Sequence, residues 1–172
     1  LKGARWTSGV VVHNPHDAEV PVHLVFLGRD DSSAATVGPR IVIGPQRSLQ
    51  LDDALAEFGE DLAGALVVIS DRVLHVGSRA FNDATIGTFG QFMTGTPVAQ
   101  GIAPGASERI LQLREDERFR TNLALANPGT ESSSASVVVR ASDGAVLGQT
   151  VLEVPATSSV FVDRILSDHS AE

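Results

Sequence analysis

Four side chains of this chain could together bind a ligand: Trp6, His75, Ser78 and Arg79. An aromatic ring can stack on a sugar, and imidazole, hydroxyl and guanidinium groups can hydrogen-bond to its oxygens. Packing and hydrogen bonding within the fold explain the same residues, because three of them lie close together among small apolar neighbours. The chain has no tyrosine, an aromatic residue on which binding faces commonly rely. The four residues are therefore a candidate ligand site with a structural alternative.

Histidines near the start of the chain raise the question of a metal site. His13, His16 and His23 lie close in sequence, but a metal site needs three or four ligands at fixed spacing, and no supporting Asp or Glu lies at a convincing distance from them. We expect surface histidines, no metal and no cofactor. The acidic residues Asp30-Asp31, Asp52-Asp53 and Asp143 could bind calcium weakly, although turns and caps explain each of them better.

Catalytic signatures are missing from the sequence. There is no G-x-S-x-G nucleophile elbow, no G-x-G-x-x-G loop and no Walker phosphate loop. The absence of cysteine removes disulfides, thiolate metal sites and cysteine nucleophiles together. We therefore expect a protein that is not an enzyme.

Charge and hydropathy exclude further classes. A net charge of −8 and a pI near 5.0 argue against nucleic acid, which binds through clustered Lys and Arg. No apolar run approaches the length of a membrane span. The sequence starts at Leu1 without a basic and apolar leader, as a mature exported protein would. A processed or excised piece of a longer protein would begin in the same way.

The most strand-like part of the chain covers residues 64–82. Two apolar runs, 65–69 and 73–76, flank Ser70-Asp71-Arg72, and β-branched residues of this kind favour strands. We expect these runs to be neighbouring antiparallel strands, which with residues 87–93 form a closing hairpin over 64–93. Earlier strands are expected at 6–13, 20–27 and 40–51, the last broken at Gly44-Pro45, followed by a short helical turn at 52–58.

The pattern starts again after a Gly- and Pro-rich linker at residues 94–106. A lead strand is expected at 107–113, followed by a solvated loop of mixed charge at 114–118. Residues 119–126 then parallel 6–13, and Asn127-Pro128 falls where Asn14-Pro15 did. With a three-residue deletion, Gly148, Pro155, Ser158 and Asp163 match Gly38, Pro45, Ser48 and Asp53, and a second helical turn is expected at 163–167.

The repeat divides the chain into two unequal units. We expect a first β-sandwich unit at 1–98, with the closing hairpin, and a second, incomplete unit at 99–172, with the lead strand. Trp6 and Phe119 share one repeat position, which indicates a core position for large aromatic residues. Sheets that lack members have unpaired edges, which invite strand addition from another chain.

The motifs of both units resemble those of a known class of protein. The Asn-Pro turns, S-D-R with the S-R after it, and R-E-D-E-R-F-R-T-N-L-A-L-A-N-P are similar to β-sandwich repeat modules of large secreted or surface proteins of bacteria. The chain more distantly resembles the sensory rhodopsin transducer family, through Gly38-Pro39, Pro45-Gln46-Arg47-Ser48, Asp52-Asp53 and Ser70-Asp71-Arg72-Val73. Val73 stands where that family has proline. The modules imply scaffolding or adhesion by a secreted or cell-surface protein of bacteria, which is the location we expect for this chain. The transducer family implies an oligomer that binds a ligand or partner.

The sequence thus predicts an all-β fold: an antiparallel, immunoglobulin-like β-sandwich, internally duplicated, with short helical turns. The leading functional hypothesis is a non-catalytic structural, assembly or adhesion module that forms head-to-tail polymers by sharing strands. Its partners would be other copies or neighbouring modules. The alternative is a β-sandwich module that binds carbohydrate or a small partner through the four residues named first.

Overall fold

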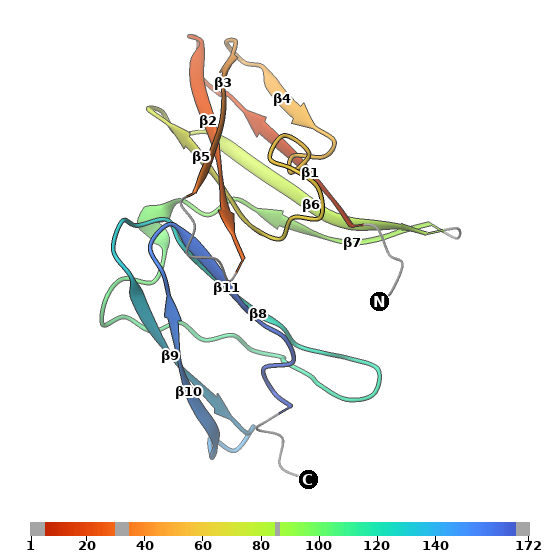
Figure 1. The fold of residues 1–172 in the computed structure, drawn as a ribbon, viewed down its shortest axis with the longest axis vertical. Coiled ribbons are helices and arrows are strands. Elements are labelled where there is room, and N and C mark those ends of the chain that lie inside the picture. Colours follow the sequence, from red (N-terminus) through yellow and green to blue (C-terminus); the bar gives the residue numbers. More distant parts are fainter. Residues whose placement is uncertain (1–5, 30–34, 85–86, 168–172) are drawn as a thin grey trace. The chain divides into compact units, whose positions relative to one another are not determined.

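The computed structural model describes residues 6–29, 35–84 and 87–167, apart from the side chains of residues 83, 84, 88 and 89. Strands make up 52% of the structure and helix 2%, which confirms the all-β prediction. The chain forms two compact units (Figure 1). The first contains Leu1–Phe26, Thr36–Leu62 and Leu66–Gly101, and the second contains Leu27–Ala35, Ala63–Ala65 and Ile102–Glu172.

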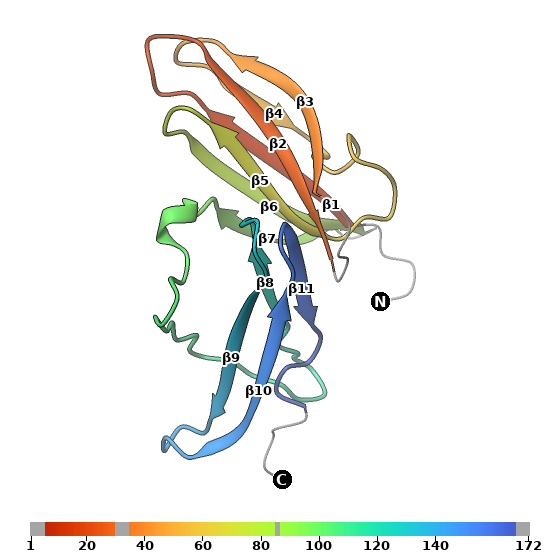
Figure 2. The same ribbon diagram turned by 60° about the vertical axis from the view of Figure 1, so that its left-hand side comes forward.

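Two sheets build the first unit. One sheet has the order β4 (Ser48–Leu51), β1 (Trp6–His13), β6 (His75–Ala84) and β7 (Gly87–Thr94), and the other has the order β3 (Thr36–Ile43), β2 (Val20–Gly28) and β5 (Gly64–Ser70). Pairing is antiparallel between β1 and β4, β1 and β6, β6 and β7, and β2 and β3. Figure 2 turns the two sheets so that both can be followed.

Alternating valines form the core between these two sheets. Val10 and Val12 of β1 and Val20 and Val22 of β2 are buried in one cluster, with partly buried side chains from β3, β4, β5 and β6 packed around it. Every second residue of a strand faces the same side, so each strand supplies its apolar face to this cluster. Burying one such side chain contributes about 1.5 kcal/mol or more, which makes the valine pairs the main stabilising feature of the unit.

The expected pairing of the two central apolar runs is wrong. Residues 65–69 lie in β5, whereas 75–76 begin β6, and these strands belong to different sheets. Ser70-Asp71-Arg72 therefore carries the chain from one sheet to the other, and the hairpin of this region is β6–β7. Leu66 and Val68 from one strand and Leu74 and Val76 from the region of the other all pack on the same core. An apolar pattern shows which faces are buried but does not distinguish a hairpin from a crossing between sheets.

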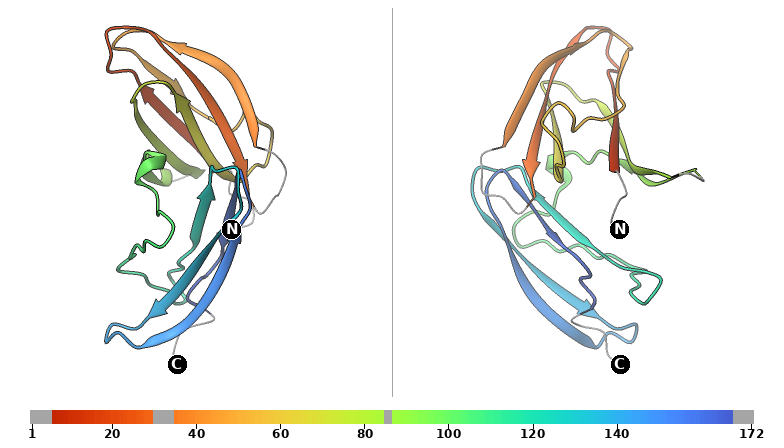
Figure 3. Two further views of the ribbon diagram at one scale, coloured as in Figure 1. Left: turned by 90° about the vertical axis from the view of Figure 1, so that its left-hand side faces the viewer. Right: turned by 45° about the vertical axis from the view of Figure 1, so that its right-hand side comes forward.

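Two pairs of strands build the second unit. β8 (Leu123–Asn127) pairs with β11 (Ser158–Val162), and β9 (Ser133–Arg140) pairs with β10 (Val146–Val154), both antiparallel. Figure 3 shows the long β9–β10 hairpin from two further sides. The predicted lead strand at residues 107–113 is wrong, because this segment has no strand pairing. Gln112, with a φ of 60°, interrupts extended backbone there, and Leu111 is 78% exposed.

The predicted helical turns are hydrogen-bonded turns instead of helix. Residues 52–58 and 163–167 contain turns and bends, and the described helix is a 3-10 turn, η1 (Val98–Gln100), in the expected linker. The N–H of Ala54 donates to the carbonyl of Ser8, and the N–H of Ile165 donates to that of Thr121. These bonds hold the first turn to β1 and the second to the segment just before β8, and segments this short do not form stable helix by themselves.

Each unit contains a hydrogen-bonded corner of the same kind, formed by an asparagine side chain at an Asn-Pro turn. The Asn14 side chain donates to the carbonyls of Ala18, Ile43 and Gly44, while its Oδ1 accepts the N–H of His16. In the second unit, Asn127 donates to the carbonyls of Glu131, Val154 and Pro155 and accepts the N–H of Gly129. Each asparagine thus fixes an Asn-Pro turn against the end of the neighbouring hairpin.

The register between β1 and β4 also corresponds to the register between β8 and β11. Val10 lies opposite Leu51 in the first unit, and Leu123 lies opposite Val162 in the second. These pairings place Ser159 in the position of Ser48, one residue later than the sequence match with Ser158. A shared origin of the two units by duplication stays a prediction, which these registers favour with a two-residue deletion in place of three.

Candidate functional site

The four candidate ligand residues lie on one sheet but on two of its faces. Val76 of β6 packs on the core, so by strand alternation Ser78 faces the core side, whereas His75 and Arg79 face outward. Trp6 begins β1 opposite Asn82, on the same side as Ser78. Ser78 donates to the carbonyl of Met93 at 3.4 Å. The structure therefore groups His75 with Arg79 and separates both from Trp6 and Ser78.

Trp6 does not occupy a core position. Its side chain is 56% exposed, and Phe119, its counterpart in the second unit, is 49% exposed. The guanidinium of Arg114 lies over the Phe119 ring, 4.4 Å from its centre. Trp6 is the first residue of β1 and comes before the buried Val10, and Phe119 comes before the start of β8 at Leu123. The repeat position that the sequence assigns to both residues stays a prediction, and the core burial expected of them is wrong.

An aromatic and basic surface covers the outward side of β1, β6 and β7. The rings of His13 and His75 are stacked with centres 6.1 Å apart, and the Arg79 guanidinium lies 4.9 Å from the centre of the Phe81 ring. The Phe92 ring covers Gly77, where an added Cβ would lie 3.2 Å from ring atoms. Such a surface can stack on a flat partner and offer hydrogen bonds to it.

The three early histidines are not gathered at one place. Nδ1 of His13 lies 3.0 Å from Oγ of Ser48, and Nε2 of His16 lies 2.8 Å from the carbonyl oxygen of Val73. His23 belongs to β2 in the other sheet, where its buried Nδ1 has no hydrogen-bond partner among the described residues. The described part of the chain contains no group of three or more His, Cys, Asp or Glu that could hold a metal ion. Asp30-Asp31 lies outside the described residues.

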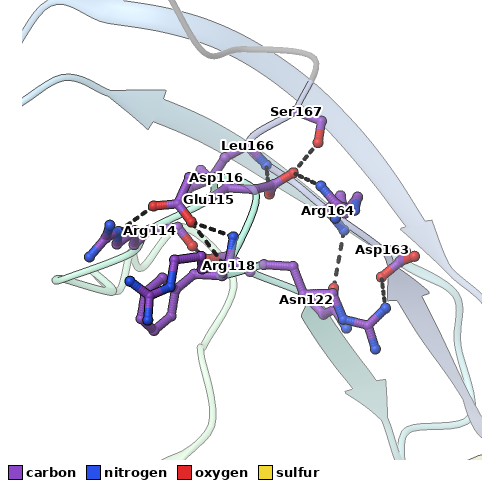
Figure 4. A network of polar contacts seen from close by, with 12 residues as sticks. Arg114, Glu115, Asp116, Arg118, Asn122, Asp163, Arg164, Leu166 and Ser167 are labelled. Atoms are coloured by element: carbon purple, nitrogen blue, oxygen red, sulfur yellow. Dashed lines mark hydrogen bonds and ion pairs between the residues drawn. The ribbon is translucent and has the colours of Figure 1, made fainter. Parts of the chain in front are cut away.

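The mixed-charge loop at residues 114–118, expected to be solvated, is held in place by hydrogen bonds and ion pairs. Asp116 accepts the N–H groups of Arg118 and Phe119 at 2.7 and 2.9 Å and pairs with Arg114 at 2.6 Å (Figure 4). The hydrogen bond from the Arg118 N–H lowers the pKa of Asp116; burial raises it, and the bonds from Arg114 and Phe119 lower it further, so the net direction is down.

Glu115 of the same loop fastens the last described turn of the chain. Its side chain is 5% exposed, and its carboxylate accepts hydrogen bonds from the Leu166 N–H and the Ser167 hydroxyl and lies 3.5 Å from the Arg164 guanidinium. Burial raises the pKa of Glu115, but these bonds and the charge of Arg164 outweigh it and hold the pKa below its ordinary value. A mixed-charge segment gives no sequence signal for this burial, because its partners lie about fifty residues away.

The feature most relevant to function is that the described strands of the second unit have fewer neighbouring strands than those of the first. Among the described strands, β1 pairs on both edges, with β4 and β6, and β2 has β3 and β5 as neighbours. Their counterparts β8 and β9 each have a neighbour on one edge, β11 and β10. The second unit therefore has no described counterpart of β5, β6 or β7.

Side chains are also less buried in the strands of the second unit than in those of the first. β2 has buried residues at Val20 and Val22 and throughout 24–27, whereas no residue of β9 is buried. Leu123 and Leu125 of β8 are likewise half-buried. Inward-facing apolar residues that stay half-buried lose much of the stabilisation that full burial would give. The second unit has the pattern of a sandwich without the strands that would complete its layers.

One edge of the second unit already receives an added segment. Residues 27–29, at the end of β2 and just after it, lie against β11, and Arg29 forms a parallel bridge with Ser159. The hydroxyl of Ser159 donates to the carbonyls of Leu27 and Gly28, each at 3.2 Å, and the Arg29 guanidinium lies 4.3 Å from the centre of the Phe161 ring. Extended backbone can thus add to this unit through an edge.

Comparison with protein-family models, curated proteins and solved structures finds no match to this chain. The resemblance to bacterial surface modules and to the transducer family therefore stays an expectation. No helix in the described part of the chain is long and apolar enough to cross a membrane.

Proposed function

We propose that this chain is a non-catalytic structural module, from a secreted or cell-surface bacterial protein, that assembles by accepting strands. The observation that carries the proposal is that β8 and β9 have one described neighbour each, where β1 and β2 have two. Backbone groups at an unpaired edge form a ready template for another strand, and pairing there would bury the half-exposed leucines beside it.

The solution mass tests this proposal. We expect light scattering after size exclusion to give a mass that rises from the 18.0 kDa of one chain in regular steps as concentration increases. Electron microscopy would then show extended particles. A mass of 18.0 kDa at every concentration would mean that the free edges do not recruit other copies.

A second function is favoured by the outward surface of the first unit. His13, His75, Arg79 and Phe92 lie on one face of the sheet, and Phe92 is 69% exposed. Under this alternative the module binds carbohydrate or a small partner. Binding on a glycan array that Phe92→Ala abolishes, by a chain that stays monomeric, would favour this alternative over assembly.

A further inference from the structure

A strand added to the second unit would meet the backbone groups on the edge of β8 that lies away from β11. The N–H of Asn14 donates to the carbonyl of Arg47, so the even-numbered residues of β1 point their backbone groups to β4 and the odd-numbered ones to β6. By the corresponding register of β8, residues 122, 124 and 126 point theirs to the free edge. Ala124 and Ala126 are also exposed and small.

The free edge of β7 has the properties of a matching strand. The N–H of Gly95 donates to the carbonyl of Val76, so alternation directs the backbone groups of Gly90, Phe92 and Thr94 away from β6. β7 contains eight residues, none of them charged and none a proline. Long uncharged edges without proline are the ones that pair with other chains.

Other free edges of the described strands are less suitable. β3 contains Pro39 and Arg40, which blunt an edge, and β4 has four residues. β10 carries Glu153 and a register shift between Val146 and Gly148. β5 is uncharged, but most of its residues are half-buried, whereas every residue of β7 with a described side chain is exposed.

We propose, building on the assembly function above, that β7 of one copy pairs antiparallel with β8 of the next copy. In the register that fits, Phe92 lies opposite Ala124, Gly90 opposite Ala126 and Thr94 opposite Asn122. A shift by two residues toward the C-terminal end of β8 would place Gly90 opposite Pro128, which has no N–H to donate.

Side-chain sizes and charges agree with this register. The Phe92 ring already covers the small residue Gly77 within its own sheet, and Ala124 gives it a second small neighbour. Met93, 46% exposed, comes beside the half-buried Leu123. Each chain carries a net charge of −8, so copies repel on average and have to meet through uncharged segments, which β7 and residues 121–127 both are.

The pairing is heterologous, because the two edges come from different surfaces of the chain. Each added copy brings a new β7 edge and a new β8 edge, so the contact can repeat head to tail. The sheet that results has the order β4-β1-β6-β7 from one copy, continued by β8-β11 of the next.

Proline substitutions test both edges. Phe92→Pro removes an N–H from the free edge of β7, and Ala124→Pro removes one from the free edge of β8, while in both cases the N–H groups that pair within the chain remain. We expect each variant to stay at 18.0 kDa where the wild type grows. Gln50→Pro is the matched control, since residue 50 faces the opposite free edge of the same sheet, and it should assemble like the wild type.

Mixing the two variants gives the decisive result. Phe92→Pro keeps an intact β8 and Ala124→Pro keeps an intact β7, so an equimolar mixture should form dimers and nothing larger. If either proline variant unfolds, Phe92→Lys with Ala124→Lys in one chain should block assembly by like charges, and Phe92→Glu with Ala124→Lys should restore it.

The outcomes separate this pairing from the general function. A wild type that assembles, with Phe92→Pro assembling equally well, would overturn the role of β7 and leave strand addition by another edge. Equal assembly of Ala124→Pro would overturn the role of β8. A wild type that stays monomeric overturns both proposals.

Discussion

Replacing Asn14 by alanine should be among the most destabilising single changes in the first unit. The side chain is fully buried and makes four hydrogen bonds, donating to three carbonyls and accepting one N–H. Alanine leaves all four backbone groups without this partner, where water cannot replace it. At about 1 kcal/mol for each bond, we expect a loss of about 4 kcal/mol in the free energy of unfolding.

Asn127→Ala is the matched control, because Asn127 makes the same four kinds of bond in the second unit. Its side chain is half-buried, so water can reach part of the corner, and we expect a loss of about 1–2 kcal/mol. Asn14→Asp should cost more than Asn14→Ala, since a carboxylate has no N–H and would face three carbonyl oxygens.

Urea unfolding measures these losses, with circular dichroism for the whole chain and fluorescence of the single tryptophan, Trp6, for the first unit. The transition of the first unit should also fall by more than about 15 °C in Asn14→Ala on heating. A loss below about 1 kcal/mol, or equal losses in both asparagine variants, would refute the assignment of the corner as a main stabilising contact.

Two further changes test the packing of β7 and the mixed-charge loop. Gly90→Ala should destabilise the β6–β7 hairpin by about 1–3 kcal/mol, because the new Cβ would lie 2.4 Å from the carbonyl oxygen of Ala80. Gly9→Ala is the control: its Cβ would have neighbours at 3.7 Å, so this variant should be close to neutral in the same thermal melt. Comparable melting temperatures for the two variants would contradict this. Glu115 has a lowered pKa in the folded chain, so its contribution to stability is present above the unfolded pKa of about 4.3 and is lost as pH falls through the folded value. We therefore expect the stability of the second unit to fall less on acidification in Glu115→Gln than in the control Glu117→Gln. An unchanged pH profile in Glu115→Gln would argue against the hydrogen bond between Glu115 and Ser167 as a stabilising contact.

Strand positions could be predicted from the sequence more readily than strand partners. Runs such as Trp6–His13 and Val20–Gly28 alternate apolar residues and end at turn signals, so local chemistry is sufficient to locate them. Which sheet receives β5 and β6 depends on contacts across the sandwich, and no residue of the Ser70-Asp71-Arg72 turn encodes that choice. The segment at 107–113 alternates equally well but pairs with none of the described strands.

The candidate site shows the same limit. His75 and Arg79 share a face because strand alternation requires it, and Ser78 is separated from them for the same reason. The stacking of His75 on His13 and the bonds of Glu115 to the turn near Ser167 join residues about fifty or more positions apart. Such contacts follow from the topology and could not be found from spacing in the sequence.

The division of β2 between the units restricts how this protein can be taken apart. Leu27–Ala35 and Ala63–Ala65 belong with the second unit, although the first unit lies on both sides of them in sequence. A fragment starting at Ile102 would lack Leu27 and Gly28, whose carbonyls satisfy the hydroxyl of Ser159, which is 5% exposed. Neither unit is a contiguous piece of chain, so no single cut, by a protease or at a gene boundary, releases an intact half. A truncation that keeps only one contiguous half would therefore leave out part of the contacts of its unit.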